Sequence, residues 1–390
     1  MIRVGFIMAH TNSGWIGGVN YLRNLVHAIK SVSNGEVEPV MLVPPSTPDH
    51  LLEGFRQAEI IRTRLIDRAC WWRPAAFREL IAKLVGRDIL MERLLKRSSI
   101  SLLSHSGHLG PHGRIPTISW LPDFQHLRLP EFFPKQEIDG RNREFKKVLK
   151  FSTSIVLSSY NAREDLKEFS PEFLQKARVL QFVSGDDRDV DYGGPERLVK
   201  KYGLEYPFFH LPNQFWVHKN HRVVIEALEV LKKSNRKVSV VSTGNIADWR
   251  RPDHYENLMK YAKEAGVDGM FNVLGVVPYD DLLALMRHSI AIINPSIFEG
   301  WSSTVEEGKS IGKMILLSNI GVHQEQMPER GVFFDPRDPS DLAEKMYAAM
   351  IAFSAEDESR YHEDARGKLQ SRFAALGEKY ISIVKEVIRD

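Results

Sequence analysis

The feature of this sequence that most constrains its fold is an alternation of short apolar runs with helical patterns, which occurs in two successive series. Runs that are apolar on both faces and separated by helices predict a parallel sheet with helices covering both sides. The strand-like runs of the first series lie at residues 3–9, 38–43, 60–65, 100–104, 117–121, 154–158 and 178–183. Those of the second series lie at residues 208–211, 238–242, 270–274, 290–294, 314–317 and 331–334. Each series is therefore expected to form one doubly wound α/β domain.

The domain boundaries follow from a polar stretch between the two series. A chain of 390 residues is longer than one hydrophobic core usually serves. Residues 184–194 are rich in Gly and Asp, which is typical of a linker. Helices of the second series are expected to begin near Asn220, Pro252, Tyr279, Thr304 and Pro339. The sequence thus predicts a first domain at residues 1–185, a linker at residues 186–200 and a second domain at residues 201–365. A final helix at residues 366–390 is expected to return to the first domain.

Composition excludes several classes of protein. Hydrophobic residues make up 43% of the chain and charged residues 26%, the balance of a water-soluble globular protein. No apolar segment approaches the roughly 20 residues that span a bilayer, and the apolar N-terminal run is too short for a signal peptide. Cys70 is the only cysteine, so a reducing compartment fits best. A net charge of +3 does not indicate nucleic-acid binding, and a cytoplasmic enzyme is expected.

One segment has an unusual charge distribution. Arg62–Arg97 contains ten Lys or Arg against four Asp or Glu, interleaved with apolar and tryptophan residues. A basic helix with an apolar stripe can lie on an anionic membrane surface, which would place the protein peripherally on the inner face of the cell membrane. The alternative is an ordinary amphipathic helix that packs its stripe on the domain core and exposes its basic face. The sequence leaves both readings open.

The strongest chemical signal follows the strand-like run that ends at Asn294. In an open α/β sheet the ligand lies at the carboxyl ends of strands, and the N-terminus of the next helix can hold a phosphate. Glu299 precedes that helix and Glu307 lies one turn inside it. Hydroxyl groups at the expected helix start come from Ser302, Ser303 and Thr304. Two carboxylates beside an anion site suit a nucleotide sugar; the alternative, Thr304 as N-cap and Glu307 as its capping-box partner, leaves Glu299 unexplained.

Glu299 and Glu307, separated by seven residues, resemble the Glu-x7-Glu motif of the retaining GT-B glycosyltransferases, above all glycosyltransferase family 4. Residues 311–326 and 331–336 resemble the end of that family's donor domain, and the similarity spans nearly the whole chain. The resemblance implies two facing Rossmann-like domains with a cleft between them. It also implies that Glu299 contacts the donor sugar and Glu307 the ribose, with Gly300 in the same donor-binding segment. Where the family usually has Gly-Leu-Pro, this chain has Ser302-Ser-Thr.

A second matching segment follows the first strand of the second domain. A cation at this turn can stabilise the charge of a departing diphosphate, and Lys219 matches the lysine that the family places here. The family's arginine falls on Asn213 or Gln214, which are uncharged. The strand-end turns at Gly244 and Gly275 resemble turns whose backbone contacts the nucleobase and phosphates.

The first domain offers candidates that face the acceptor. Gly17 and Gly18 follow the first strand and permit close approach of the backbone to a ligand. The resemblance places the matching glycines beside the diphosphate and the acceptor. After the fifth strand the family often has His-Asp; this chain has Pro122-Asp123, so Asp123 is retained. His126 is a candidate to reach the cleft instead.

No resident metal or other cofactor is predicted. Asp187, Asp189 and Asp191 lie in the expected linker, where carboxylates are typically solvated. His105, His108 and His112 have no neighbouring Cys or further His to complete a zinc site, although His105 at a strand end could line the cleft. The nucleotide sugar is a substrate rather than a cofactor.

The resemblance implies a metal-independent, retaining glycosyltransferase that moves a hexose from a nucleotide sugar to a glycan or lipid-linked acceptor. Synthesis of a surface polysaccharide such as O-antigen or capsule fits the family. Two alternatives remain open: a GT-B nucleotide-sugar 2-epimerase, and a catalytically silent nucleotide-sugar binder.

Overall fold

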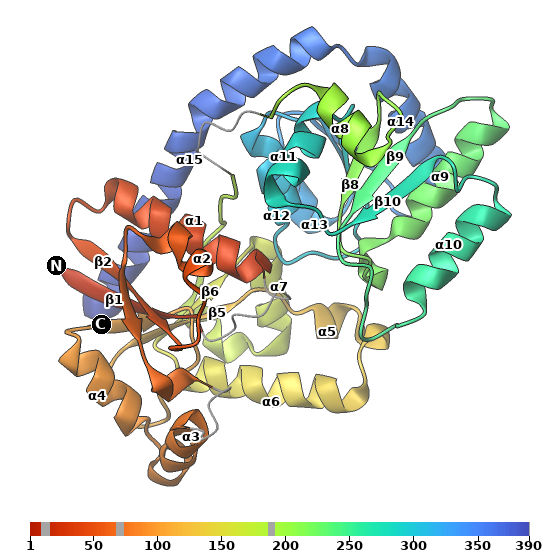
Figure 1. The fold of residues 1–390 in the computed structure, drawn as a ribbon. Coiled ribbons are helices and arrows are strands. Elements are labelled where there is room, and N and C mark those ends of the chain that lie inside the picture. Colours follow the sequence, from red (N-terminus) through yellow and green to blue (C-terminus); the bar gives the residue numbers. More distant parts are fainter. Residues whose placement is uncertain (9–15, 68–73, 186–191, 390) are drawn as a thin grey trace. The chain divides into compact units, whose positions relative to one another are not determined.

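The computed structural model describes residues 1–8, 16–67, 74–185 and 192–389. The chain forms two compact units, drawn in Figure 1. The first consists of Met1–Leu127, Pro134–Ser184 and Ser371–Asp390, and the second of Arg128–Phe133 and Gly185–Gln370. Cys70, the Trp71–Trp72 pair and the linker carboxylates Asp187, Asp189 and Asp191 lie outside the described residues.

The first unit is built on a seven-stranded parallel sheet in the order β3-β2-β1-β4-β5-β6-β7. Its strands are β1 (Ile2–Ile7), β2 (Val37–Val43), β3 (Glu59–Arg62), β4 (Leu102–Ser104), β5 (Thr117–Leu121), β6 (Ser154–Leu157) and β7 (Ala177–Val179). Its helices are α1 (Ile16–Val32), α2 (Asp49–Leu52), α3 (Pro74–Val85), α4 (Ile89–Arg97), α5 (Gln125–Arg128), α6 (Lys135–Phe151) and α7 (Tyr160–Phe169). The strand order reverses between β1 and β4, which makes their carboxyl ends the switch point of this sheet.

The second unit is built on a six-stranded parallel sheet in the order β10-β9-β8-β11-β12-β13. Its strands are β8 (Phe209–Pro212), β9 (Val240–Thr243), β10 (Phe271–Gly275), β11 (Ile292–Asn294), β12 (Ile315–Ser318) and β13 (Gly331–Phe334). Its helices are α8 (Pro195–Tyr202), α9 (His221–Lys233), α10 (His254–Glu264), α11 (Tyr279–His288), α12 (Ser303–Ser310), α13 (Gly321–Gln326) and α14 (Pro339–Ala352). The switch point of this sheet lies between β8 and β11.

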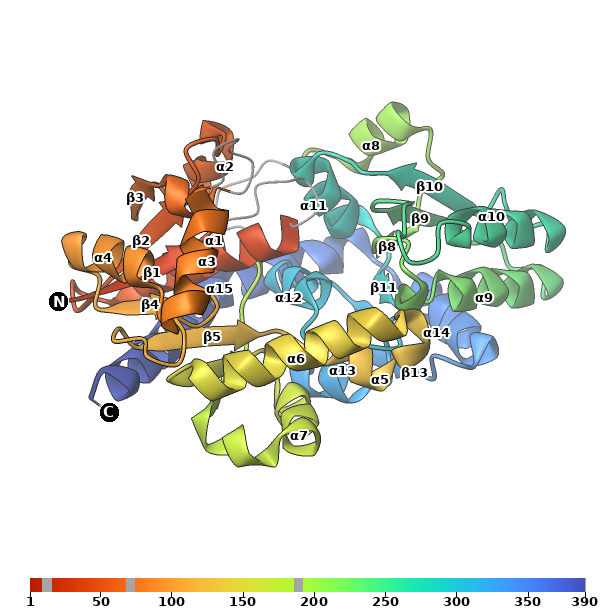
Figure 2. The ribbon, with the colours of Figure 1, turned by 90° about the horizontal axis from the view of Figure 1, so that it is seen from below.

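The apolar runs form strands because they can be buried on both faces. All four residues of β6, β9 and β12 are buried, and helices follow the strands in alternation (Figures 1 and 2). Every predicted strand-like run of both series contains a strand, so the prediction of two doubly wound domains is confirmed. The five predicted helix starts of the second series are confirmed to within two residues.

The last helix, α15 (Ala355–Arg389), belongs to the second unit through Gln370 and to the first unit from Ser371. Its later part packs tightly on the first unit. A Cβ on Gly377 would lie 2.1 Å from the carbonyl oxygen of Ala28 in α1, so the two helices approach closely there. Tyr380 is fully buried, and its hydroxyl donates to Oγ of Ser104 at the end of β4 over 2.8 Å.

The structure corrects one feature of the basic segment, which was expected to be a single helix. Gly86 has a φ of +69°, which ends α3, and Asp88 begins α4 by accepting a hydrogen bond from the backbone N–H of Met91. The alternative of a stripe packed on the core holds for α4, where Met91 and Leu95 are buried. None of the helices in the described ranges is long and apolar enough to cross a bilayer.

Candidate active site in the second unit

The second unit brings together two charged residues from the loops on either side of its switch point. Lys219 ends a short 3-10 turn, Val217–Lys219, that follows β8, and Glu299 lies in the loop between β11 and α12. Nζ of Lys219 lies 2.6 Å from Oε1 of Glu299. Only 15% and 9% of the two side chains is exposed, so this is a largely desolvated ion pair. It forms because β8 and β11 are neighbours in the sheet, whose carboxyl ends carry both loops to one edge.

The electrostatics of this pair keep the Glu299 carboxylate charged. Burial by itself would raise the pKa of Glu299, but the neighbouring Lys219 ammonium holds that pKa below its usual value. Burial lowers the pKa of His218 to about 3, so this neighbour is neutral. The site therefore presents one carboxylate and one ammonium group at neutral pH.

Helix α12 begins at the same edge of the sheet. Ser302 is its N-cap, and the Ser302 hydroxyl oxygen accepts from the backbone N–H of Val305 at 3.4 Å. Nδ2 of Asn294, the last residue of β11, donates to the same hydroxyl oxygen at 2.8 Å. Thr304 instead donates to the carbonyl oxygen of Pro212 at 3.4 Å. The alternative in which Thr304 caps the helix is therefore wrong, and Glu307 is not needed as its capping partner.

The other predicted donor-binding residues border these loops. Ser303 is the first residue of α12, Gly300 lies between Glu299 and the cap, and Glu307 is buried within α12. Asn213, directly after β8, is buried, and its Nδ2 has no hydrogen-bond partner in the described chain. An amide donor left bare at a switch point is suited to an oxygen-rich ligand. The neighbouring Gln214 is partly exposed.

The turns after β9 and β10 lie against the loop that follows β8. The backbone N–H of Gly244 donates to the carbonyl oxygen of Gly275 at 2.8 Å. A Cβ on Gly244 would lie 2.5 Å from the carbonyl oxygen of Asn213, and Gly244 has a φ of +139°. No other residue type fits this position without displacing the backbone.

Two residues of α13 that the sequence reasoning did not select also lie at this edge. Nε2 of Gln326 donates to the carbonyl oxygen of Ser302 at 3.0 Å, and the Gln326 side-chain oxygen accepts from the Ser302 N–H at 3.2 Å. His323 lies one turn earlier and is fully buried, and its Nδ1 lies 2.9 Å from the carbonyl oxygen of Ser318 at the end of β12. Both fall in the stretch 311–326 that carries the family resemblance, but nothing in their spacing distinguishes them from ordinary helix residues.

The structure places four predicted site residues in the first unit. Gly17 lies in the first turn of α1 with open space around it, and Gly18 is buried beside it. Asp123 accepts from the backbone N–H of Gln125 at 2.9 Å and so fixes the start of α5. His126 is fully buried, with Nε2 3.0 Å from Oδ1 of Asn142 in α6. Its burial indicates a packing role, and substrate contact by His126 stays a prediction without a supporting contact.

Two of the three histidines considered as a zinc site, His105 and His108, make separate contacts. His105 follows β4 at the switch point of the first sheet, and its Nε2 lies 2.6 Å from the hydroxyl of Tyr21. Burial lowers the pKa of His105 to about 3. Nδ1 of His108 accepts from the N–H of Gly110 at 2.9 Å. Across the part of the chain that the structure describes, no three His, Cys, Asp or Glu side chains are grouped as metal ligands would be.

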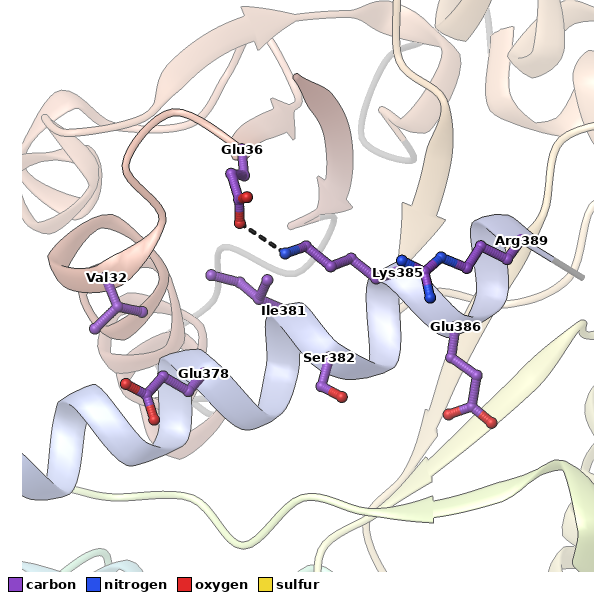
Figure 3. Close-up of a pocket in the computed structure, with 8 residues that line it drawn as sticks. All are labelled: Val32, Glu36, Glu378, Ile381, Ser382, Lys385, Glu386 and Arg389. Carbon is purple, nitrogen blue, oxygen red and sulfur yellow. Dashed lines mark hydrogen bonds and ion pairs between the residues drawn. The ribbon is translucent and has the colours of Figure 1, made fainter.

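A surface groove of the first unit lies elsewhere and has a different character (Figure 3). It runs between the last turns of α15 and the segment that joins α1 to β2. Its charged side chains are partly neutralised by one another and by nearby groups: Lys385 pairs with Glu36 at 2.7 Å, and Glu386 pairs with Arg178. The groove contains none of the predicted site residues.

Comparison with known proteins gives a consistent result. Residues 198–366 match the family model described as "Glycosyl transferases group 1". The chain is 23% identical over 311 residues to the O-antigen chain mannosyltransferase B of Escherichia coli, which covers 75% of this chain and 78% of that protein. A solved glycosyltransferase from Rickettsia africae ESF-5 is similar with a TM-score of 0.69 at 18% identity, covering 100% of this chain and 99% of the other.

A further structural neighbour is HepE of Anabaena, solved in complex with UDP and glucose. It has a TM-score of 0.67 at 14% identity, and the match covers 99% of this chain and 100% of that chain. These likenesses confirm the predicted fold class, two parallel-sheet α/β domains of the GT-B type. The matched residues 198–366 include the Glu299–Glu307 segment, so the predicted resemblance to glycosyltransferases is confirmed for that part of the chain, while retention and membership of family 4 stay predictions.

Proposed function

We propose that this chain, a nucleotide-sugar-dependent glycosyltransferase whose residues 198–366 match the group 1 family model, transfers mannose to a lipid-linked glycan. The product would be part of a surface polysaccharide such as O-antigen. The observation that carries the proposal is the Lys219–Glu299 ion pair at the switch point of the second sheet. The choice of mannose rests on the likeness to the E. coli mannosyltransferase.

The roles of the two charged residues follow from their hydrogen-bonding capacity. An ammonium group has three N–H donors, and Lys219 directs one of them to Glu299. Two remain for the oxygens of a diphosphate, where charge develops as the sugar departs. Glu299 has lone pairs left to accept hydrogen bonds from sugar hydroxyls. Asn213 adds an amide donor at the same edge, and the start of α12 adds backbone N–H groups.

We propose that the configuration of the anomeric carbon is retained without a covalent enzyme intermediate. A carboxylate nucleophile must be free to attack, whereas Glu299 is held by Lys219 at 2.6 Å. The acceptor hydroxyl would then attack from the face that the diphosphate leaves. The anomeric configuration of the isolated product is read from the one-bond carbon–hydrogen coupling constant at the anomeric carbon. An inverted configuration would contradict this mechanism.

We further propose that the protein works in the cytoplasm, at the inner face of the membrane that carries its acceptor. Phe77, Leu80 and Leu84 follow one face of α3 and are 60%, 55% and 79% exposed. Residues 77–97 contain six Lys or Arg and three Asp or Glu. Each of the three acidic side chains pairs with Arg78 or Arg87. The remaining cations make no ion pair with any described residue; they are Lys83, Arg93, Lys96 and Arg97.

This combination supports an anionic lipid surface as the partner of α3 and α4. Exposed apolar side chains enter the interface of a bilayer, and unpaired cations beside them attract acidic headgroups. A protein partner would need a face that is both acidic and apolar. Such a face is rarer than the surface of an acidic bilayer. Each unpaired cation near such a surface contributes about 1 kcal/mol at moderate ionic strength.

The central experiment is incubation of the purified chain with nucleotide sugars, beginning with GDP-mannose and including UDP- and dTDP-hexoses. Release of free nucleotide that depends on a glycan acceptor supports a transferase. A changed sugar on an intact nucleotide would indicate the epimerase alternative, and an unaltered donor that still raises the unfolding temperature would indicate a silent binder. The proposal fails if no nucleotide sugar is consumed.

A further inference from the structure

His323 is a buried side chain of the second unit to which the proposed chemistry assigns no role. It lies in α13, the helix that follows β12 after a short loop, and the exposed fraction of its side chain is 0%. Nδ1 of His323 lies 2.9 Å from the carbonyl oxygen of Ser318 and 3.0 Å from the Ser318 hydroxyl oxygen. The ring is therefore held at the end of β12, at the same edge of the sheet as Glu299.

These contacts determine which ring nitrogen carries the proton. The Ser318 hydroxyl donates its own hydrogen to the carbonyl oxygen of Ser296, 2.5 Å away. Both Ser318 atoms that face Nδ1 can then only accept, so Nδ1 must be the N–H of the ring. Burial lowers the pKa of His323, so the ring is neutral at physiological pH. A neutral imidazole with hydrogen on Nδ1 has a bare lone pair on Nε2.

Nε2 of His323 is buried and has no hydrogen-bond partner in the described chain. Other buried histidines share this property, among them His126, His210 and His221. His323 lies beside the loop of the candidate site, because Ser318, which its Nδ1 contacts, donates a hydrogen bond to the carbonyl oxygen of Ser296, three residues before Glu299. A buried acceptor without a donor is costly unless a ligand supplies the donor.

The position of the ring is fixed from a second direction. Gln326, one turn later in α13, exchanges hydrogen bonds with both backbone groups of Ser302, the N-cap of α12. Gln326 also donates to Oε1 of Glu306 at 3.0 Å. Helix α13 is thus tied to the start of α12 at one end and to β12 at the other. His323 cannot turn its bare nitrogen away without breaking these contacts.

We propose that His323 is a specificity residue whose Nε2 accepts a hydrogen bond from one hydroxyl of the donor hexose, beside a hydroxyl accepted by Glu299. The inference rests on the proposed function, in which the second unit holds a nucleotide sugar. The chemistry selects the sugar, because a diphosphate offers only acceptor oxygens to a bare lone pair. A hexose offers neutral O–H donors on adjacent carbons, which suit two acceptors at the same edge of the sheet.

The test uses two replacements that separate the two ring nitrogens. His323→Asn retains a side-chain N–H near the Nδ1 position and removes the acceptor, whereas His323→Gln can present an acceptor oxygen near the Nε2 position. The kcat/KM ratio of GDP-mannose to each of its 2-, 3-, 4- and 6-deoxy analogues is measured for the unaltered enzyme and both variants. The ratio compares two donors on the same sample, so partial loss of folded protein cancels. His210→Gln, at a buried histidine of β8, is the matched control.

In the unaltered enzyme, the kcat/KM of one deoxy donor is expected to be about tenfold to a hundredfold below that of GDP-mannose. The reason is that the missing hydroxyl leaves Nε2 of His323 without a donor. The same loss is expected for His210→Gln and, in weaker form, for His323→Gln. His323→Asn should process that deoxy donor and GDP-mannose with a ratio within about threefold. If an active enzyme shows the same discrimination in His323→Asn, or none in any form, the inference is overturned while the proposed function stands. If no sugar nucleotide is consumed by the unaltered enzyme, the proposed function and this inference fail together.

Discussion

The ammonium of Lys219 and the carboxylate of Glu299 lie 2.6 Å apart although 80 residues separate them in the chain. Their contact depends on the position of β11 directly beside β8, which brings the loop after each strand to the switch point of the sheet. The pair is therefore a product of topology rather than of local sequence. It joins the residue proposed to stabilise the departing diphosphate to the residue proposed to hold the sugar.

Breaking this ion pair should affect activity and stability by different amounts. Lys219→Met and Glu299→Gln are each expected to lower kcat by about a hundredfold or more, the usual effect of losing a group that stabilises developing charge. Each should also lower the free energy of unfolding, by up to about 3 kcal/mol, because one partner is left buried and unpaired. The double variant should lose less stability than the two single variants combined. Urea unfolding of all four proteins measures this coupling.

Lys345→Ala, which removes an ion pair with Asp341 within α14, serves as the control for these variants. It should leave kcat unchanged and alter the free energy of unfolding by less than about 1 kcal/mol, since surface pairs contribute little. Additive losses in the double variant of Lys219 and Glu299 would show that the two side chains do not interact in solution.

Stability should fall on the acidic side of neutrality. Burial lowers the pKa of four histidines to about 3, namely His105, His210, His218 and His221. In the unfolded chain these groups bind a proton below about pH 6.5. The stabilisation is therefore complete above pH 6.5 and is lost as the pH falls from there toward 3, with each histidine costing up to about 1.4 kcal/mol per pH unit.

The measurement is the free energy of unfolding at several values between pH 7.5 and pH 5. His210→Gln is expected to make the decline less steep, because one titrating group is removed. A free energy of unfolding that stays level across this range would contradict the burial of these rings.

Gly244 should tolerate no side chain. In Gly244→Ala the new Cβ would meet the carbonyl oxygen of Asn213 at 2.5 Å in a backbone conformation that L residues rarely adopt. We expect a loss of about 1–3 kcal/mol in the free energy of unfolding, together with weaker donor binding, measured by isothermal titration with the nucleotide diphosphate. Gly269→Ala, where a Cβ meets nothing within 4 Å, is the matched control and should change neither quantity.

Transfer is expected to continue without a divalent cation. The candidate site pairs Glu299 with a lysine, and an ammonium group can supply the charge that a metal would otherwise provide at the diphosphate. Dialysis against EDTA followed by initial-rate measurement should give at least about half of the untreated rate. Full loss of activity, restored by Mg²⁺ or Mn²⁺, would show that the enzyme needs a metal.

The exposed face of α3 should govern binding to membranes. Leu80→Gln combined with Leu84→Gln is expected to reduce co-sedimentation with vesicles of 30% phosphatidylglycerol in phosphatidylcholine by about tenfold, because two exposed apolar side chains are lost. Ile351→Gln, an equally exposed apolar residue of α14, is the control. Equal binding of the unaltered protein to vesicles of phosphatidylcholine alone would contradict the role of the unpaired cations.

The sequence predicted the strands well because a strand buried on both faces shows its pattern locally. β9, with Val240 and Val241 buried beside Ser242, can be read from its own residues. The order of the strands is a different matter, since no local pattern distinguishes β11 from β9 as a neighbour of β8. The break at Gly86 was missed because an apolar stripe continues on both sides of it, although Asp88 is a good helix start.

Lys219 and Glu299 could be selected from the sequence because each lies in the loop after a predicted strand and matches a motif of the resembled family. His126 shows the limit of that reasoning. It also follows a strand end, but α6 covers it through Asn142, and contact with a helix that begins nine residues later is not written in the local pattern. His323 was missed for a related reason: its bare nitrogen results from a hydrogen bond between Ser318 and Ser296, two loops joined only in the folded sheet.

The last helix has a consequence for how the protein is made. Phe373, Tyr380 and Val384 of α15 are buried in the first unit, whose preceding segment ends at Ser184. A ribosome adding about 5–20 residues per second needs roughly ten to forty seconds to pass from one segment to the other. Throughout that interval the first unit is without its final helix, and the apolar surface around Ala28 and Ser104 is uncovered. Chains that stall or terminate before residue 371 therefore expose an aggregation-prone surface, and the first unit can be completed only after its last segment has been translated.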